Sequence, residues 1–124
     1  MILIVDDNHI VRQATVLTVR YLLGFDTDEA ADGFAALEKV RTTDYAAIVM
    51  DCEMPGLDGF ECASQIRQLE GVTGSRTPII GMTASVDRAI RENCLKAGMD
   101  DYLDKSCTNE QLRETLVKWA WSAL

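Results

Sequence analysis

The amino-acid sequence predicts an α/β fold in which five parallel strands form a sheet covered by five helices. Short apolar runs alternate along the chain with longer segments in which apolar residues recur at helical spacing. Glycine or a polar capping residue follows or precedes several of these segments. This alternation is typical of strands joined by helical crossovers, which place helices on both faces of a parallel sheet.

Length and composition limit the chain to one globular unit. The sequence has 124 residues, of which 48% are apolar and two are proline. That is enough apolar surface for a sizeable core, and the length leaves room for one domain. We therefore expect residues 1–124 to form a single domain.

Charge and hydropathy exclude several kinds of partner. The formal net charge of −8 argues against nucleic-acid binding, which usually needs a basic surface. The longest apolar runs, such as residues 46–50, are too short to cross a bilayer, and no basic region precedes the first of them. The four cysteines form no CxxC pair, so reduced thiols are expected. The chain is predicted to be cytoplasmic, with proteins, cations or small phosphorylated species as its partners and neither nucleic acid nor membrane among them.

The first strand and helix follow directly from the pattern. Residues 2–5 are continuously apolar, as in a central strand buried on both faces. A helix is predicted over residues 9–23 and ends at Gly24. The side chains expected to face the sheet recur at intervals of four, three and four: Ile10, Ala14, Leu17 and Tyr21.

The next three elements extend to the middle of the chain. A weaker strand is predicted over residues 27–30, and Asp32-Gly33 introduces a helix over residues 34–41. Residues 46–50 form the third strand. After a loop over residues 52–58, a helix is predicted over residues 59–69, with one apolar face: Cys62, Ile66 and Leu69.

The last four elements repeat the alternation. A polar loop over residues 71–77 precedes the fourth strand, residues 79–82. Ser85 is expected to cap a helix that ends at Gly98, with Ile90, Cys94 and Ala97 directed inward. A short strand near residues 102–103 follows. Thr108-x-x-Gln111 reads as a capping box that opens the last helix, whose core side carries Leu112, Leu116 and Trp119.

Polar residues with related chemistry end four of the predicted strands. These are Asp6 with Asp7, Asp51, Thr83 and Lys105. Parallel strands bring their carboxyl ends to one edge of the sheet, where open α/β sheets bind ligands. Two carboxylates about 4 Å apart repel each other by roughly 4 kcal/mol at an effective dielectric near 20. The cluster therefore calls for a cation.

The residue types favour phosphoryl chemistry with magnesium. His9 is the only histidine, and the sequence lacks a GxSxG elbow, a glycine-rich dinucleotide loop and a GxxxxGK[ST] loop. Magnesium prefers carboxylate oxygens and bridges them to phosphate. Asp51 is then the candidate nucleophile, Thr83 a hydroxyl donor to a phosphoryl oxygen, and Lys105 a positive charge beside it. Taken alone, Asp6, Asp7 and Asn8 fit helix capping equally well.

Four motifs in order carry a family resemblance. They are Asp6-Asp7 after the first strand, Val-Met-Asp-Cys-Glu-Met-Pro-Gly-Leu-Asp-Gly at 49–59, Pro-Ile-Ile-Gly-Met-Thr-Ala at 78–84 and Ala-Gly-Met-Asp-Asp-Tyr-Leu-Asp-Lys at 97–105. With these motifs the chain resembles the receiver domains of two-component response regulators over essentially its whole length. The resemblance implies a flavodoxin-like, doubly wound sheet with strand order 2-1-3-4-5.

The resemblance also implies roles for individual residues. Asp51 is similar to the phosphoacceptor of the family. Asp6, Asp7, Asp51 and the backbone carbonyl of Glu53 resemble its magnesium ligands. Thr83 and Tyr102 resemble the switch pair, in which the hydroxyl moves toward the phosphate and the aromatic ring turns inward. Phosphorylation would then change the surface that partners bind.

Finer features of the motifs point to a phosphorelay. Asp-x-Glu-Met-Pro, Met-Thr-Ala and Gly-Met-Asp-Asp-Tyr-Leu are similar to receivers attached to hybrid histidine kinases. This resemblance implies a histidine kinase or a histidine-phosphotransfer domain as phosphodonor. A kinase or output domain linked covalently to the receiver is an open possibility, as is a stand-alone receiver.

One position departs from the family pattern. Ser106 follows Lys105 where the family has proline after a cis peptide bond. A cis bond before a residue other than proline costs about 2.5–4 kcal/mol, so a trans bond is expected here. Our hypothesis is that Lys105 still reaches the phosphate but is held less rigidly.

Two other functions fit parts of the site. A haloacid-dehalogenase-like phosphatase also uses a strand-end aspartate, a threonine and a lysine, but it needs a second aspartate two residues later, where this chain has Glu53. A degenerate receiver that only binds partners is favoured by Ser106 alone. The protein should not be a classical enzyme, although it would catalyse its own phosphorylation and slow dephosphorylation.

Overall fold

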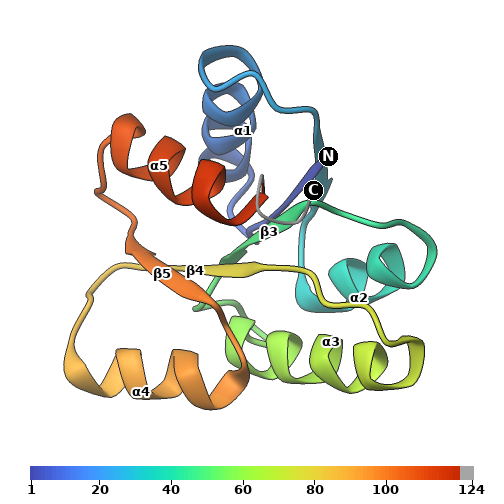
Figure 1. Cartoon of the computed structure of the whole chain (residues 1–124). Coiled ribbons are helices and arrows are strands. Elements are labelled where there is room, and N and C mark those ends of the chain that lie inside the picture. Colours follow the sequence, from blue (N-terminus) through green and yellow to red (C-terminus); the bar gives the residue numbers. More distant parts are fainter. Residues whose placement is uncertain (121–124) are drawn as a thin grey trace.

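The computed structural model describes residues 1–120, in which five parallel strands form one sheet in the order β2-β1-β3-β4-β5 (Figure 1). The strands are β1 (Ile2–Val5), β2 (Thr27–Ala30), β3 (Ala47–Asp51), β4 (Ile79–Thr83) and β5 (Asp101–Asp104). The helices are α1 (His9–Leu17), η1 (Thr18–Leu22), α2 (Gly33–Thr42), α3 (Gly59–Thr73), α4 (Arg88–Ala97) and α5 (Asn109–Ala120). The predicted fold class and strand order are confirmed.

Helices cover both faces of the sheet (Figure 1). The α1–η1 segment and α5 lie on one face, over a core that includes Ile4, Val49 and Leu116. Helices α2, α3 and α4 lie on the other face, over a second core that includes Met50 and Ile66. No helix of residues 1–120 combines the length and apolar content that a bilayer span requires.

The central strands are buried as their sequences predict. Every residue of β1 and β3 is buried, since helices cover both faces of these strands. The chain reverses its direction of strand addition between β1 and β3, which pair from Ile2 with Ala47 to Val5 with Met50. Ligands bind beyond the carboxyl ends of the strands at such a reversal. The fold thus places Asp6, Asp7 and Asp51 at this point.

The prediction for the inward face of the first helix was wrong. Ile10 is 79% exposed, Leu17 55% and Tyr21 72%, whereas Val16 and Val19 are buried. The same spacing of four, three and four residues is repeated two positions later, in a row that packs against the sheet: Arg12, Val16, Val19 and Leu23. This row is hard to recognise in the sequence because its first residue, Arg12, is charged. In the structure the Arg12 guanidinium pairs with Glu29 at the sheet edge.

Two helix boundaries also differ from the predictions. Helix α3 continues through Gly71 and ends at Gly74, which has a φ of 79°. Glycine adopts this left-handed conformation without the steric cost of a Cβ. Helix α4 is capped by Asp87, whose carboxylate accepts from Ile90 N–H, and not by Ser85. The capping box of α5 is confirmed, since Thr108 and Gln111 exchange side-chain to backbone hydrogen bonds of 2.9 and 3.1 Å.

A partly buried ionic network lies at the sheet edge opposite the acidic residues. Arg67 of α3 donates to the carbonyls of Gly98 and Thr77 at 2.9 and 2.8 Å and to the Asp100 carboxylate at 2.7 Å. Its side chain also pairs with Glu70 and is only 15% exposed. Asp100 in turn accepts from Ile79 N–H at the start of β4. One guanidinium therefore joins α3 to two other segments of the chain. One is the segment before β4, and the other is the turn between α4 and β5.

A second polar contact joins β2 to the segment before β3. The buried Tyr45 hydroxyl donates to Asp28 at 2.7 Å, and Lys39 pairs with the same carboxylate at 2.9 Å. Although burial favours the protonated acid, the hydrogen bonds from Lys39 and Tyr45 lower the pKa of Asp28 below its usual value. Burial and the Asp28 carboxylate raise the pKa of Tyr45 to about 12, so its hydroxyl is a donor at neutral pH.

Replacing Tyr45 by phenylalanine should lower the free energy of unfolding by about 1.5–3 kcal/mol near pH 7, because Asp28 loses a hydrogen bond to its charged form. Since folding lowers the pKa of Asp28, its contribution is present above the ordinary value near 3.9 and disappears as the pH falls through the folded value. Urea unfolding between pH 7 and pH 3 should show the difference between the variant and the parent shrinking toward the acid end. The exposed Tyr21→Phe is the control. A loss that does not vary with pH would refute the charged hydrogen bond as its source.

Candidate functional site

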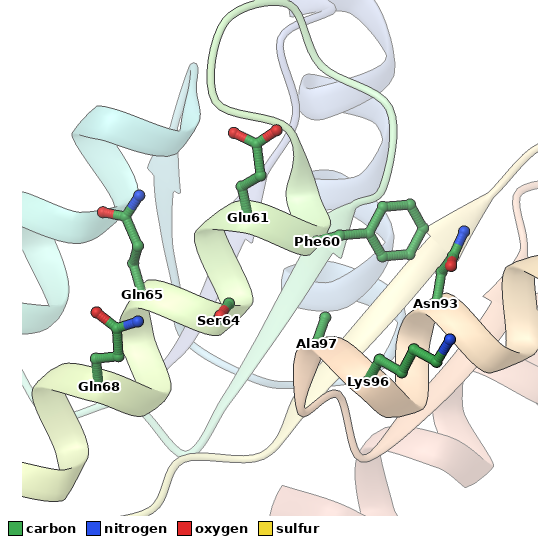
Figure 2. Close-up of a pocket in the computed structure, with 8 residues that line it drawn as sticks. All are labelled: Phe60, Glu61, Ser64, Gln65, Gln68, Asn93, Lys96 and Ala97. Atoms are coloured by element: carbon green, nitrogen blue, oxygen red, sulfur yellow. The ribbon is translucent and has the colours of Figure 1, made fainter.

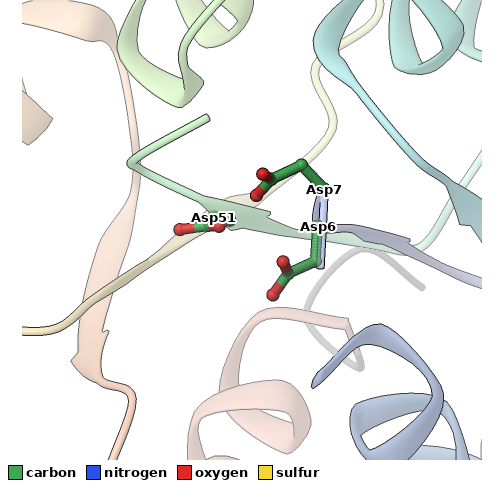
Figure 3. Close-up of side chains that lie close together, drawn as sticks. All are labelled: Asp6, Asp7 and Asp51. Carbon is green, nitrogen blue, oxygen red and sulfur yellow. The ribbon is translucent and has the colours of Figure 1, made fainter. Parts of the chain in front are cut away.

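Three carboxylates meet at the carboxyl edge of the sheet (Figure 3). Asp6 and Asp7 follow β1, and Asp51 is the last residue of β3. Carboxylate oxygens from all three lie within 4.8 Å of one another. Asp6 is 7% and Asp51 2% exposed, whereas Asp7 is exposed to solvent. The juxtaposition that the strand pattern predicts is therefore present in the structure.

The surroundings of Asp6 disfavour its negative charge. Burial, with further repulsion from Asp51 and Asp7, raises the pKa of Asp6 above its usual value against the effect of a hydrogen bond from Asn8 N–H at 2.9 Å. When all three carboxylates are ionised, the single positive charge of the nearby Lys105 ammonium does not balance them. The cluster then keeps a net negative charge. Hard oxygen donors in this number suit a divalent cation such as Mg²⁺.

Asp51 is held by one ammonium and one backbone amide. Lys105 Nζ lies 2.9 Å from Asp51 Oδ1, and Glu53 N–H donates to the same oxygen at 3.1 Å. Although partial burial acts against it, the hydrogen bond to Asp51 raises the pKa of Lys105. The ammonium is therefore charged at neutral pH and faces the carboxylate.

The loop after Asp51 closes because position 59 is glycine. Gly59 N–H donates to the Cys52 carbonyl at 3.1 Å, and a Cβ at this position would lie 2.2 Å from the Asp51 carbonyl oxygen. Any other residue would push α3 away from the end of β3. The glycine that reads as a helix-entry residue thus also keeps the loop tight around Asp51.

The backbone of β5 positions Lys105. Lys105 N–H donates to the Thr83 carbonyl at 2.7 Å, which joins the ends of β4 and β5. Ser106 donates from its backbone and its hydroxyl to Asp104 Oδ1, at 2.8 and 2.6 Å. Residues 1–120 contain no cis peptide bond, which confirms the trans bond expected before Ser106. This side-chain turn occupies the position where the resemblance implies a proline, and Lys105 reaches Asp51. How rigidly Lys105 is held stays a prediction.

Thr83 and Tyr102 lie near the cluster without contributing to it. Thr83 is fully buried, and within the described chain its hydroxyl donates to the Ser85 carbonyl at 3.1 Å and not to Asp51. Tyr102 of β5 is half-buried against the core on the α3–α4 face, and the Arg91 guanidinium of α4 lies 5.8 Å from its ring centre. Both residues therefore connect the sheet edge with α4 and the loop before it.

Sequence reasoning missed Arg12 as a supporting residue. Its guanidinium donates to the backbone carbonyl of Asp6 at 2.9 Å and pairs with Glu29, so it fixes the end of β1. Arg12 lies two residues from an apolar position of the expected stripe, and helical periodicity gives no signal for a partly buried arginine. A small hollow of about 50 Å³ beside the cluster is lined by Asp6, Asp51, Lys105, Val11, Thr15 and Met82, among others.

Comparison with protein families and curated relatives gives one consistent result. Residues 2–117 match the family model described as the response regulator receiver domain. The chain is 38% identical over 118 residues to the hybrid signal transduction protein dokA of Dictyostelium discoideum and 35% identical over 127 residues to the sensor histidine kinase GacS of Pseudomonas protegens. These matches cover 95% and 99% of the chain but only 7% and 13% of the relatives.

Solved structures agree with these matches. The receiver domain of the sensor histidine kinase PA1611 from Pseudomonas aeruginosa, solved with magnesium in its active-site cleft, has a TM-score of 0.86 and 39% identity, and the match covers 97% of this chain and 96% of that one. The receiver domain of the histidine kinase CKI1 from Arabidopsis thaliana, solved with Mg²⁺ and BeF₃⁻, has a TM-score of 0.81 and 30% identity and covers 98% and 89%.

The strand order, the acidic cluster at the sheet edge, the match over residues 2–117 and the identity to curated relatives lead to one conclusion. This chain belongs to the response regulator receiver domain family.

Proposed function

We propose that residues 1–124 form one receiver domain in which Asp51 accepts a phosphoryl group from phosphohistidine; residues 121–124 lie outside the described part of the chain. The observation that carries this proposal is the position of Asp51. Its carboxylate is 2% exposed, lies between the Lys105 ammonium and the carboxylates of Asp6 and Asp7, and ends a strand at the ligand-binding edge of the sheet.

Mg²⁺ fits this donor set. The carboxylates of Asp6, Asp7 and Asp51, together with the backbone carbonyl of Glu53, would hold the ion. When bound, it neutralises charge on the carboxylates and on the phosphoryl oxygens. The magnesium in the cleft of the PA1611 receiver supports this assignment.

The chemical step needs one oxygen of Asp51 and little else from the protein. That oxygen attacks phosphorus and forms a P–O bond while the P–N bond of the phosphohistidine breaks, and the electron pair of the broken bond returns to the imidazole nitrogen. Lys105, already 2.9 Å from Asp51, would face the negative charge of the transferred group. The side chains mainly position and neutralise, as phosphoryl transfer requires.

Thr83 and Tyr102 would convert phosphorylation into a change of surface. To donate to a phosphoryl oxygen, the Thr83 hydroxyl must exchange its hydrogen bonds with Ser85, and the loop before α4 would move with it. Tyr102 would then turn inward, away from Arg91 of α4. A phosphoryl group can shift this equilibrium because it interacts with Thr83 in one of the two states only.

Intact mass after incubation with acetyl phosphate tests the proposal. With Mg²⁺ we expect one phosphoryl adduct per chain, and after chelation of the metal we expect none. Sustained hydrolysis of several phosphomonoesters without a lasting adduct would instead show a small phosphatase. Absence of both adduct and turnover would show a degenerate receiver that only binds partners.

A histidine kinase or histidine-phosphotransfer domain is the proposed partner. We propose that this partner docks on the exposed apolar stripe of the first helix of this chain. Ile10, Leu17, Tyr21 and Leu22 are between 55% and 79% exposed. Ile10 lies in the first turn of α1, four residues after Asp6, so a helical domain on this stripe can present a histidine to the acidic cluster. The relatives include a hybrid signal transduction protein and a sensor histidine kinase, and this chain spans a small part of each, so a linked kinase or output domain is also proposed.

Replacing Ile10 by glutamate should slow phosphotransfer from the partner at least tenfold, because burying an isoleucine on docking contributes about 1.5–3 kcal/mol. Labelling by acetyl phosphate should not change, since the small donor needs no docking face. The measurement is the rate of transfer from a phosphorylated histidine-phosphotransfer domain of the source cell. Val72→Glu is the matched control, because Val72 is 88% exposed near the end of α3. Equal slowing with both donors would contradict a docking role for Ile10.

A further inference from the structure

A tight turn follows β5 and contains Lys105. Cys107 N–H donates to the Asp104 carbonyl at 2.9 Å, which closes a β-turn with Lys105 and Ser106 at its centre. The described residues contain no cis peptide bond, and only glycines among them have a positive φ. Turns of types II, I′ and II′ need a positive φ and type VI needs a cis bond, so this turn is of type I, the commonest class.

A pair of side chains closes the same turn a second time. Asp104 Oδ1 accepts from Ser106 N–H at 2.8 Å and from the Ser106 hydroxyl at 2.6 Å. Aspartate is favoured at the first position of a type I turn, because its carboxylate can accept from the backbone two residues later. The hydrogen bonds from the Ser106 hydroxyl and N–H lower the pKa of Asp104 below its usual value, so this carboxylate is ionised at neutral pH.

The backbone of Lys105 is held on both sides. Its own N–H donates to the Thr83 carbonyl at 2.7 Å, and the peptide group that follows it is held by Asp104. The Lys105 ammonium lies 2.9 Å from Asp51 Oδ1, and the lysine side chain is 34% exposed. Because this side chain is long and partly solvated, the direction in which it leaves the backbone determines how well the ammonium stays on Asp51.

From these contacts we infer that Asp104 and Ser106 are positioning residues for phosphoryl transfer, which fix the backbone of Lys105 so that its ammonium faces the transferred group. The inference rests on the proposed function of Asp51. Proline could not replace Ser106 without a change of turn, because it lacks the N–H and is disfavoured at the third position of a type I turn. The carboxylate and the serine therefore act as a pair.

The rate at which acetyl phosphate labels Asp51, measured by intact mass at saturating Mg²⁺, tests the positioning role. Ser106→Ala removes one of the two hydrogen bonds and Asp104→Ala removes both. They should slow labelling about threefold and about tenfold, because small displacements of a charged group in the site slow the reaction strongly. Asp104→Asn keeps an oxygen acceptor of the same shape and should recover most of the wild-type rate.

A second background distinguishes positioning from a general structural effect. In Lys105→Met, the further replacement of Ser106 by alanine should leave the labelling rate unchanged, since the group to be positioned is already missing. Equal slowing by Ser106→Ala with and without Lys105 would overturn the inference. Circular dichroism confirms that each variant is folded.

Two exposed residues outside the turn provide matched controls. Ser64 of α3 lines the groove between α3 and α4 (Figure 2). Asp44 lies in the segment between α2 and β3. Ser64→Ala and Asp44→Ala make the same chemical changes as the two test variants, and both should label at the wild-type rate.

Backbone order parameters from ¹⁵N relaxation separate this inference from the proposed function, because they need no phosphorylation. The amides of Lys105 and Ser106 should have values of about 0.85 in the wild type and fall to about 0.6 in Asp104→Ala. Asp104→Asn should keep the wild-type values. A wild-type chain that forms no adduct would overturn the proposed function. Wild-type labelling together with unchanged order parameters or unchanged rates in Asp104→Ala would overturn this inference alone.

Discussion

Replacing Asp51 by asparagine should abolish the phosphoryl adduct that we expect acetyl phosphate to form in the presence of Mg²⁺. The amide has nearly the same shape as the carboxylate but lacks the negative charge that makes its oxygen a nucleophile. Intact mass after incubation measures the loss, and circular dichroism shows that the fold is retained. The site is buried beside Lys105, so the effect belongs to the nucleophile and not to a surface charge.

The same variant should weaken the thermal stabilisation that Mg²⁺ gives. A ligand that binds only the folded state raises stability by RT ln(1 + [L]/Kd), and Asp51 is one of the three carboxylates of the cluster. Asp58→Asn is the matched control, because it makes the same chemical change at a position seven residues later. Asparagine is also as good an N-cap for α3 as aspartate. Asp58→Asn should keep both the adduct and the magnesium effect. An adduct that persists in Asp51→Asn would show that another residue is phosphorylated.

Replacing Arg67 by methionine should lower the free energy of unfolding by about 2–4 kcal/mol, a large loss for a single substitution outside the apolar core. Methionine retains the apolar stem but removes the ion pair with Asp100 and the hydrogen bonds to Gly98 and Thr77. Removal of one partner from a pair with little solvent exposure is costly because the carbonyls of Gly98 and Thr77 lose their donor. Asp100 retains its ion pair with Arg76 at 2.6 Å and its hydrogen bond from Ile79 N–H, so the loss is smaller than for an isolated buried charge. The midpoint and slope of urea unfolding give the value.

The exposed arginine of α4 provides the control for this prediction. Arg88 pairs with Glu92 at 3.4 Å, with its side chain 93% exposed, and such pairs contribute at most about 1 kcal/mol. Arg88→Met should therefore change stability by roughly 0.5 kcal/mol or less. Phosphorylation of folded Arg67→Met should proceed at the wild-type rate, since the network lies at the opposite edge of the sheet. A loss below 1 kcal/mol for Arg67→Met would show that the network contributes little.

Most of the fold could be predicted because burial on both faces leaves a simple pattern. The strands at residues 2–5 and 46–50 read as continuous apolar runs, and the structure places β1 and β3 there within one residue. Helix ends with a local signal were also predictable, as at Gly24, Gly98 and the capping box of α5. These features depend on neighbours in the sequence, which is why the sequence reveals them.

The errors arise where two local patterns compete. The first helix has two rows with the same spacing, and the row that begins with the more polar residue, Arg12, faces the sheet because Glu29 and the Asp6 carbonyl accept its hydrogen bonds. Ser85 and Asp87 are both good caps, and the structure uses Asp87 while Ser85 bonds to Thr83. The spacing of residues along the helix does not distinguish such alternatives. The hydrogen-bond partner that decides between them lies far away in the sequence, as Glu29 does for Arg12, or in a loop, as Ser85 does for Thr83.

The sequence by itself determined the order of the strands along the chain, the carboxylates that end them and hence the chemistry of the cluster, because parallel strands must bring their carboxyl ends to one edge. Only the tertiary structure decided which side of the first helix is exposed, that Thr83 bonds to Ser85, and that Arg67 bonds to Gly98 and Asp100. The physical reason is that these contacts join elements far apart in the chain, and their geometry depends on how the helices pack against the sheet.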